Sequence, residues 1–250
     1  MSHTFQTENL KQLFSYPFKD ERWQGKLVVA SALMFAGFIV PVLPMLALYG
    51  YVARIMRRII SGDGKLGLPE WEDWGDLLGT GLKVLGPMII FTLPALLLMF
   101  LSYATWFFPV VFAGLAAESG DLGPQGFLVL LSILSTGMGF VLFGVAMLMG
   151  LFLGILQPVI MTHVVPTGEF AAAFRFYEWW RVFRSNREEF LLAYALIVGL
   201  SVGLGFLYQA AMLTVVLCCI LPFLLPIASV YLLLVMAPLF AQAYRTALEV

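Results

Sequence analysis

Few residues inside the apolar runs of this sequence have side chains that could do chemistry, and His163 is the first to consider. An imidazole can ligate a metal ion, and its titration near neutral pH lets it relay protons. A metal site needs several ligands, but His3 is the only other histidine, and the charge-free run around His163 holds no carboxylate. We therefore interpret His163 as a packing or interface residue at a helix end, shortly before Pro166.

Gln157 and Gln209 are two further candidate polar residues inside the apolar runs. Gln157 precedes Pro158, whose missing N–H frees backbone groups that the amide could satisfy. The runs hold no Asp, Glu, Lys or Arg, the residues that usually mark proton relays and ion pathways inside membranes. No serine has a base placed for it, and neither G-x-x-x-x-G-K nor H-E-x-x-H occurs. The sequence therefore predicts no catalytic, cofactor-binding or metal site, no cofactor and no enzyme activity.

Charged residues are scarce and unevenly distributed. They make up 12% of the 250 residues, about half the share found in soluble domains. Lysine and arginine occur in the N-terminal tail, in a loop after residue 53 and in residues 169–189, whereas the breaks near 118–126 and 213–219 have neither. Because basic loops stay on the cytoplasmic side, we expect a multi-pass protein of the cell membrane with both termini in the cytoplasm.

Three basic and aromatic stretches have the pattern of helices that lie in the membrane interface, at about 5–18, 69–80 and 168–184. In the second, Pro69 suits a first helical position, and Trp71, Trp74 and Leu78 would share one helix face. Tryptophan anchors at headgroup level, and arginines attract anionic lipids. The candidate lipid or interface residues are Trp71, Trp74, Arg54, Arg57, Arg58, Arg175, Trp180 and Arg181.

The long apolar runs must position these stretches. Each equals or exceeds the roughly 20 residues that cross a bilayer. We expect an all-α fold, a polytopic transmembrane helix bundle that forms one membrane domain over residues 1–250, with six membrane helices and cytoplasmic interfacial amphipathic helices. The expected parts are an interfacial tail (1–26), a short hairpin (27–60), a cytoplasmic loop (61–83), long helices (84–117 and 127–163), an interfacial segment (164–189) and two further helices (190–213 and 217–244).

Residues 27–60 leave two alternatives open. Pro41 and Pro44 interrupt helix continuity, and each arm of about 15 to 17 residues is about 22 to 26 Å long, short of the roughly 30 Å hydrocarbon core. A shallow proline-broken hairpin is favoured because it keeps the basic tail inside. A single kinked crossing is the alternative.

Three segments carry a resemblance to a known family. "YPFKDERWQGKLVVASAL" (16–33), "YGYVARIMRRIISGDGKLGLPEWEDWGDLLGTGLKVL" (49–85) and "AAFRFYEWWRVFRSN" (172–186) resemble the domain of unknown function 4013 family of prokaryotic membrane proteins. The resemblance implies a multi-helix membrane protein of about this length. It implies no activity and no catalytic residues.

We interpret the protein as a non-enzymatic integral membrane protein that organises lipid or a protein partner at the cytoplasmic membrane face. The alternative is a permease or permease subunit for a neutral or amphiphilic substrate, and an intramembrane enzyme is the least favoured reading. Expected partners are membrane lipids and, in addition, a membrane-protein partner or a second copy, with no nucleic acid. The Gly150–Gly154 and Gly199–Gly203 pairs allow close helix packing, which we interpret as packing within the chain rather than between copies.

Overall fold

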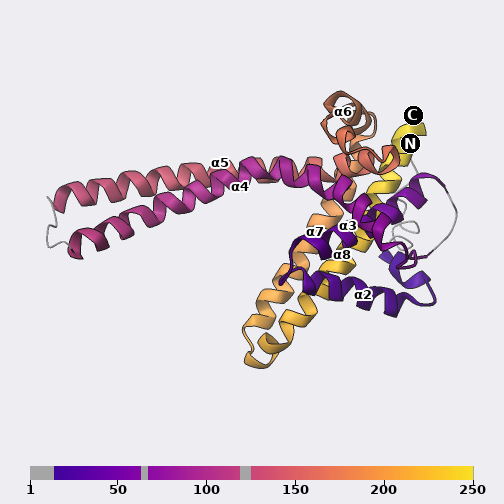
Figure 1. The fold of residues 1–250 in the computed structure, drawn as a ribbon, viewed down its shortest axis with the longest axis horizontal. Coiled ribbons are helices and arrows are strands. Elements are labelled where there is room, and N and C mark those ends of the chain that lie inside the picture. Colours follow the sequence, from indigo (N-terminus) through magenta and orange to yellow (C-terminus); the bar gives the residue numbers. More distant parts are fainter. Residues whose placement is uncertain (1–13, 63–66, 119–124, 250) are drawn as a thin grey trace. The chain divides into compact units, whose positions relative to one another are not determined.

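The computed structural model describes residues 14–62, 67–118 and 125–249, and over these residues the protein is all-α, without strands (Figure 1). Seven α-helices and two short 3-10 helices follow one another along the described chain. The N-terminal helix expected at 5–18 falls largely outside the described residues, and η1 (Tyr16–Lys19) lies at its end.

Four of the described helices are long and apolar enough to cross a membrane. They are α4 (Trp74–Glu118), α5 (Gln125–Thr167), α7 (Arg187–Met212) and α8 (Val215–Glu249). Their apolar spans are 41, 41, 26 and 29 residues long, against the roughly 20 residues that a crossing needs. The all-α prediction is confirmed, and four helices rather than six meet this criterion.

The segment expected to form a hairpin consists of two helices, α2 (Trp23–Ala36) and α3 (Val42–Ile60). Residues 37–41 separate them, as the prolines predicted, and α2 packs against α3. Helix α3 is largely buried on the face that carries Leu48, Tyr51 and Ile55. Its arginines lie in its second half, where cations suit the negative end of the helix dipole.

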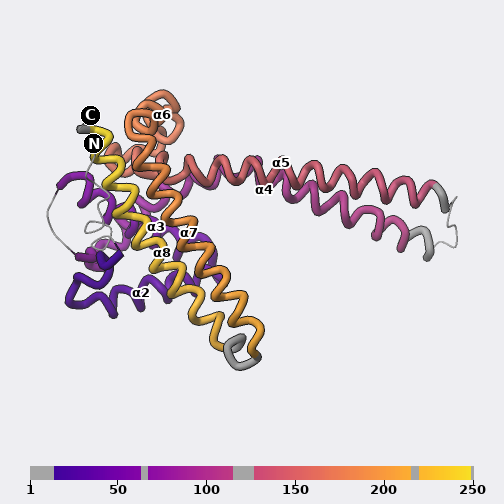
Figure 2. The backbone as a smooth tube through the Cα atoms, turned by 180° about the vertical axis from the view of Figure 1, so that it is seen from behind, coloured from indigo at the N-terminus to yellow at the C-terminus, as the bar shows by residue number. Residues whose placement is uncertain are grey.

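The chain divides into two compact units, of which the first comprises Met1–Pro87 and Gln157–Val250. Helix α8 is its centre, because it packs against α7, α3, α2 and α6, and Figure 2 shows α7 and α8 side by side. Leu234, Leu239 and Phe240 of α8 are almost fully buried. Ala237 and Ala241 of the same helix are also buried, and such small residues let neighbouring helices approach closely.

The second unit, Met88–Leu156, contains the later two thirds of α4 and most of α5, which run side by side (Figure 2). The Ser102 hydroxyl is fully buried and donates to the Gly139 carbonyl at 2.8 Å. A Cβ at Gly139 would collide with the Trp106 indole, so glycine is what permits this approach. Large apolar side chains cover the outside of both helices, as expected where lipid is the solvent.

The segment expected as an interfacial helix at 69–80 has a different structure. Residues 68–70 are not helical, Asp73 has a left-handed backbone with φ of 53°, and α4 begins at Trp74 and continues into the long apolar run. The predicted helix start at Pro69, and the shared helix face of Trp71 and Trp74, are therefore wrong. The physical reason, described below, is that side chains rather than a helix satisfy the carbonyls of this segment.

The segment expected as one interfacial helix at 168–184 is two elements, η2 (Phe170–Phe174) and α6 (Phe176–Ser185). The glycine pairs also differ from expectation. Open space lies beside Gly199 and Gly203, and beside Gly150 within its own compact unit, so the expected close packing within the chain is not seen at these three residues.

Two glycines bring α3 and α4 into backbone contact. A Cβ at Gly50 would collide with the Leu77 carbonyl, and one at Gly81 with the Leu46 carbonyl, whereas open space lies beside Gly79. We predict that Gly50→Ala and Gly81→Ala each lower the free energy of unfolding by about 1–3 kcal/mol, while Gly79→Ala raises it by about 0.5–1 kcal/mol. Thermal unfolding of the full chain in detergent measures this. Equal stability of the Gly50→Ala and Gly79→Ala variants would contradict the contact.

Candidate functional site

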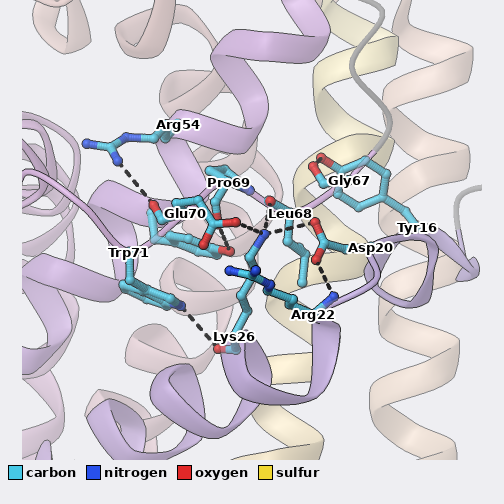
Figure 3. Close-up of polar contacts among 11 residues, drawn as sticks. Tyr16, Asp20, Arg22, Lys26, Arg54, Gly67, Leu68, Pro69, Glu70 and Trp71 are labelled. Carbon is cyan, nitrogen blue, oxygen red and sulfur yellow. Dashed lines mark hydrogen bonds and ion pairs between the residues drawn. The ribbon is translucent and has the colours of Figure 1, made fainter.

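The extended segment at residues 67–72 is held by side chains from other elements, an arrangement that we call the carbonyl clamp (Figure 3). Four donors from the start of the chain, α2 and α3 reach four backbone carbonyls of the segment. The pairs are Tyr16 with Gly67 (2.9 Å), Lys26 with Leu68 (2.7 Å), Tyr51 with Pro69 (2.8 Å) and Arg54 with Glu72 (3.0 Å). Since these carbonyls have no helical partners, each would cost free energy if it were buried without a donor.

Lys26 is the most buried charge of the clamp, with 6% of its side chain exposed. Its ammonium group lies 2.8 Å from a carboxylate oxygen of Asp20 and 2.8 Å from one of Glu70. Burial alone would lower the pKa of Lys26, but the hydrogen bonds and charges of Asp20 and Glu70 outweigh burial and raise it above 10.5. The ammonium therefore stays charged, and its three donors all have acceptors.

Two other titratable groups of the clamp, Tyr16 and Asp20, also have shifted pKa values. Burial raises the pKa of Tyr16 to about 12, against a partial lowering by Arg58. For Asp20, burial would raise the pKa, but the hydrogen bonds from Lys26 and from the backbone N–H of Arg22 hold it below 3.8. The neutral phenol and the ionised carboxylate are thus the forms that the folded clamp requires.

Trp71 belongs to the clamp rather than to a separate helix. Its ring stacks on Tyr51 with centroids 3.9 Å apart and on Trp74 at 5.7 Å. Its indole N–H donates to the Lys26 carbonyl at 3.2 Å. Trp74 is 46% exposed at the start of α4. The structure therefore brings these two predicted interface residues together, with Trp71 engaged by the protein itself.

Two arginines of α3, Arg54 and Arg57, also have partners within the chain. Arg54 pairs with Asp76 at 3.0 Å in addition to its clamp carbonyl. Arg57 donates to the Val165 carbonyl at 3.4 Å, which links α3 to the end of α5. Arg58 is half-buried at the end of α3. Guanidinium groups used in this way position helices more than they offer charge to a ligand.

His163 links three helices. Its Nδ1 lies 3.2 Å from the Tyr244 hydroxyl of α8, and its Nε2 lies 3.2 Å from a Glu178 carboxylate oxygen of α6. Arg175 lies 3.8 Å from the same carboxylate and pairs with Glu169 at 2.6 Å. The buried histidine thus links the start of α6 to α5 and α8.

The outer face of α6 carries what we call the aromatic–arginine face, formed by Tyr177, Trp180, Arg181 and Arg184. The Arg181 guanidinium lies 5.9 Å from the Tyr177 ring centroid, and that of Arg184 lies 5.7 Å from the Trp180 ring centroid. Tyr177 is 77% exposed and Trp180 39%. With Ser185 these residues line a pocket of about 320 Å3. Among the residues that the structure describes, no carboxylate lies within ion-pair distance of Arg181 or Arg184.

The inner face of α6 is anchored. Trp179 is 3% exposed and its indole N–H donates to the Ala173 carbonyl of η2 at 3.1 Å. At the end of the helix, the Ser185 hydroxyl lies 3.4 Å from the Ala247 carbonyl of α8. The helix is therefore held at both ends while its aromatic–arginine face points outward.

The remaining predicted polar residues lie apart from these clusters. Gln157 is half-buried on α5, and Gln209 is exposed on α7. Across residues 14–62, 67–118 and 125–249, no three His, Cys, Asp or Glu side chains gather as a metal site would require. Sequence reasoning missed the clamp role of Lys26, the partners of His163 and the place of Arg184. Only for Arg184 did the sequence offer a signal, because it follows Trp180 by four residues, one helical turn.

Four membrane-length helices and an amphipathic helix between two of them are the features of an α-helical membrane protein of several spans. Comparison with protein-family models matches residues 33–220 to the family described as Protein of unknown function (DUF4013), and the chain belongs to this family. The resemblance in the sequence is thereby confirmed. Comparisons with curated proteins and with solved structures gave no match.

The clamp predicts how stability depends on pH. Because the pKa of Tyr16 is raised from 10.0 to about 12 and that of Lys26 is raised above 10.5, both groups stabilise the fold fully below pH 10 and lose this contribution as the pH rises through their folded pKa values. Asp20 has a lowered pKa, so its contribution is present above pH 3.8 and is lost as the pH falls below it. Thermal unfolding in detergent should therefore fall off at both extremes.

The Lys26→Met variant tests the assignment. At neutral pH we predict a loss of about 2 kcal/mol, because the Leu68 carbonyl and Asp20 lose their donor. The stability gap between this variant and the unmodified protein should narrow above pH 10.5. Lys19→Met, at an exposed lysine, is the matched control and should change little. A gap that stays constant with pH would contradict the role of Lys26.

Proposed function

We propose that this protein is a non-enzymatic integral membrane protein that organises lipid at the cytoplasmic face of the cell membrane, through the outer face of α6. The aromatic–arginine face supports this proposal most directly. It presents exposed aromatic rings beside two guanidinium groups that no carboxylate of the described chain neutralises. Aromatic rings suit the headgroup region, and each arginine near an anionic leaflet contributes about 1 kcal/mol of attraction.

The orientation is part of the proposal. Basic residues of α3 and of residues 169–189 would lie inside, together with both chain ends, following the rule that lysine and arginine stay on the cytoplasmic side. In this arrangement α2 and α3 form a shallow hairpin, and four long helices cross the bilayer. Helix α6 follows α5 and precedes α7, so it would lie at the inner headgroup level.

Lipid is favoured over the other occupants of this face. The arginines Arg54, Arg57 and Arg175 are engaged by carbonyls or carboxylates of the chain itself, so general basicity does not distinguish α6. What distinguishes α6 is that two guanidinium groups without a carboxylate partner lie beside exposed aromatic rings. A phospholipid interface complements both features. The permease alternative has no comparable support, since Gln209 is exposed on α7.

Lipid clustering tests the proposed function. The full chain is reconstituted into phosphatidylcholine vesicles that contain a minority of fluorescent phosphatidylglycerol, and self-quenching reports enrichment of the anionic lipid around the protein. We expect quenching with the unmodified protein and loss of most of it in a Tyr177→Ser, Trp180→Ser double variant. Trp74→Ser, which removes an exposed tryptophan away from α6, should retain it. Vesicles that show no enrichment with the unmodified protein would refute the function.

A further inference from the structure

We infer that Arg181 and Arg184 together form a binding site for the phosphate of a glycerophospholipid with a net negative headgroup. This inference rests on the proposed function and names its ligand. It converts a general attraction to the inner leaflet into a defined site on one helix, with a chemical preference that can be measured.

Helix geometry places the two guanidinium groups together. Arg181 and Arg184 are three residues apart on α6, and residues at this spacing lie on neighbouring positions of one helix face. Each is held over a ring, Arg181 at 5.9 Å from Tyr177 and Arg184 at 5.7 Å from Trp180. Both line the same pocket of about 320 Å3, so one phosphate can receive donors from both.

The charges on the aromatic–arginine face favour an anionic ligand. Three basic side chains of this unit meet carboxylates: Lys26 meets Asp20, Arg54 meets Asp76 and Arg175 meets Glu169. Arg181 and Arg184 are exposed and have no such partner in the described residues; each lies beside an aromatic ring instead. A guanidinium group binds phosphate through two parallel hydrogen bonds, which makes arginine better suited than lysine to this position.

The position of α6 in the chain favours a lipid over a soluble phosphate. The helix begins nine residues after α5 ends at Thr167, and α7 begins two residues after Ser185, so two membrane-length helices confine it to the membrane boundary. Phe176 and Tyr177 are 56% and 77% exposed, which is costly beside water and favourable beside acyl chains. The acyl chains and the phosphate of one lipid satisfy both requirements.

The site is organised before the ligand arrives. Glu178 is bound to His163 at 3.2 Å, Trp179 donates to Ala173 at 3.1 Å, and Ser185 reaches Ala247 at 3.4 Å. The helix therefore does not need to fold on binding, and less of the interaction free energy is lost to ordering.

Short-chain lipids that dissolve as monomers test the site. The full chain in a neutral maltoside detergent is titrated with dihexanoyl phosphatidylglycerol, dihexanoyl phosphatidylcholine or sn-glycerol 3-phosphate, and heat of binding is recorded. We expect saturable binding of the phosphatidylglycerol at least tenfold tighter than that of the other two. The Arg181→Gln, Arg184→Gln double variant should weaken it at least tenfold. The Arg181→Lys, Arg184→Lys double variant should also weaken binding, by about fivefold, because an ammonium group keeps the charge but cannot make the two parallel hydrogen bonds of a guanidinium group.

Arg22→Gln is the matched control, since it removes one exposed arginine elsewhere and should leave binding unchanged. The melting temperature of every variant should equal that of the unmodified protein. Binding that survives the double glutamine substitution would overturn the site, and so would equal affinity for phosphatidylcholine. Equal affinity for glycerol 3-phosphate would overturn the lipid as the ligand. If lipid clustering in vesicles persists while this site fails, the proposed function stands and the inference alone is refuted.

Discussion

Backbone carbonyls that no helix satisfies are the constraint on which this structure depends. Between α3 and α4 the chain runs extended past residues 67–72, and an apolar protein can bury such a segment only if donors reach its carbonyls. The donors come from both sides of the break between α2 and α3, and they are the side chains of Tyr16, Lys26, Tyr51 and Arg54. The clamp thereby ties the start of the chain, α2 and α3 to the loop that leads into α4.

This constraint divides the basic residues into two groups with different roles. In the first group, the side chains donate hydrogen bonds to carbonyls and carboxylates of the chain and so set the positions of helices; its members are Lys26, Arg54 and Arg57. Arg181 and Arg184 keep theirs available and lie against exposed rings. Positive charge alone would not separate the groups, because both occur in stretches of similar composition. The contacts that each basic side chain makes in the folded structure separate the two groups. These contacts are the reason why lipid recognition is proposed for α6 and not for the clamp.

The sequence predicted what depends on local pattern. Charge-free runs predicted the four long helices and their all-α character, and Pro41 predicted the break after α2. The sequence did not predict features that depend on hydrogen-bond donors far away along the chain. Trp71 and Trp74 have helical spacing, yet Tyr51 and the Lys26 carbonyl hold Trp71 in an extended segment. Likewise the partners of His163, Glu178 and Tyr244, come from helices that only the fold brings together.

Photo-cross-linking tests this division most directly. The full chain is reconstituted with a phosphatidylglycerol analogue that carries a photoreactive group in its headgroup, or with the matching phosphatidylcholine analogue, and labelled peptides are mapped by mass spectrometry. The account predicts labelling at residues 177–185 that is specific to the anionic analogue, and no such excess at residues 67–72. Anionic-specific labelling of residues 67–72 without labelling of α6 would contradict it.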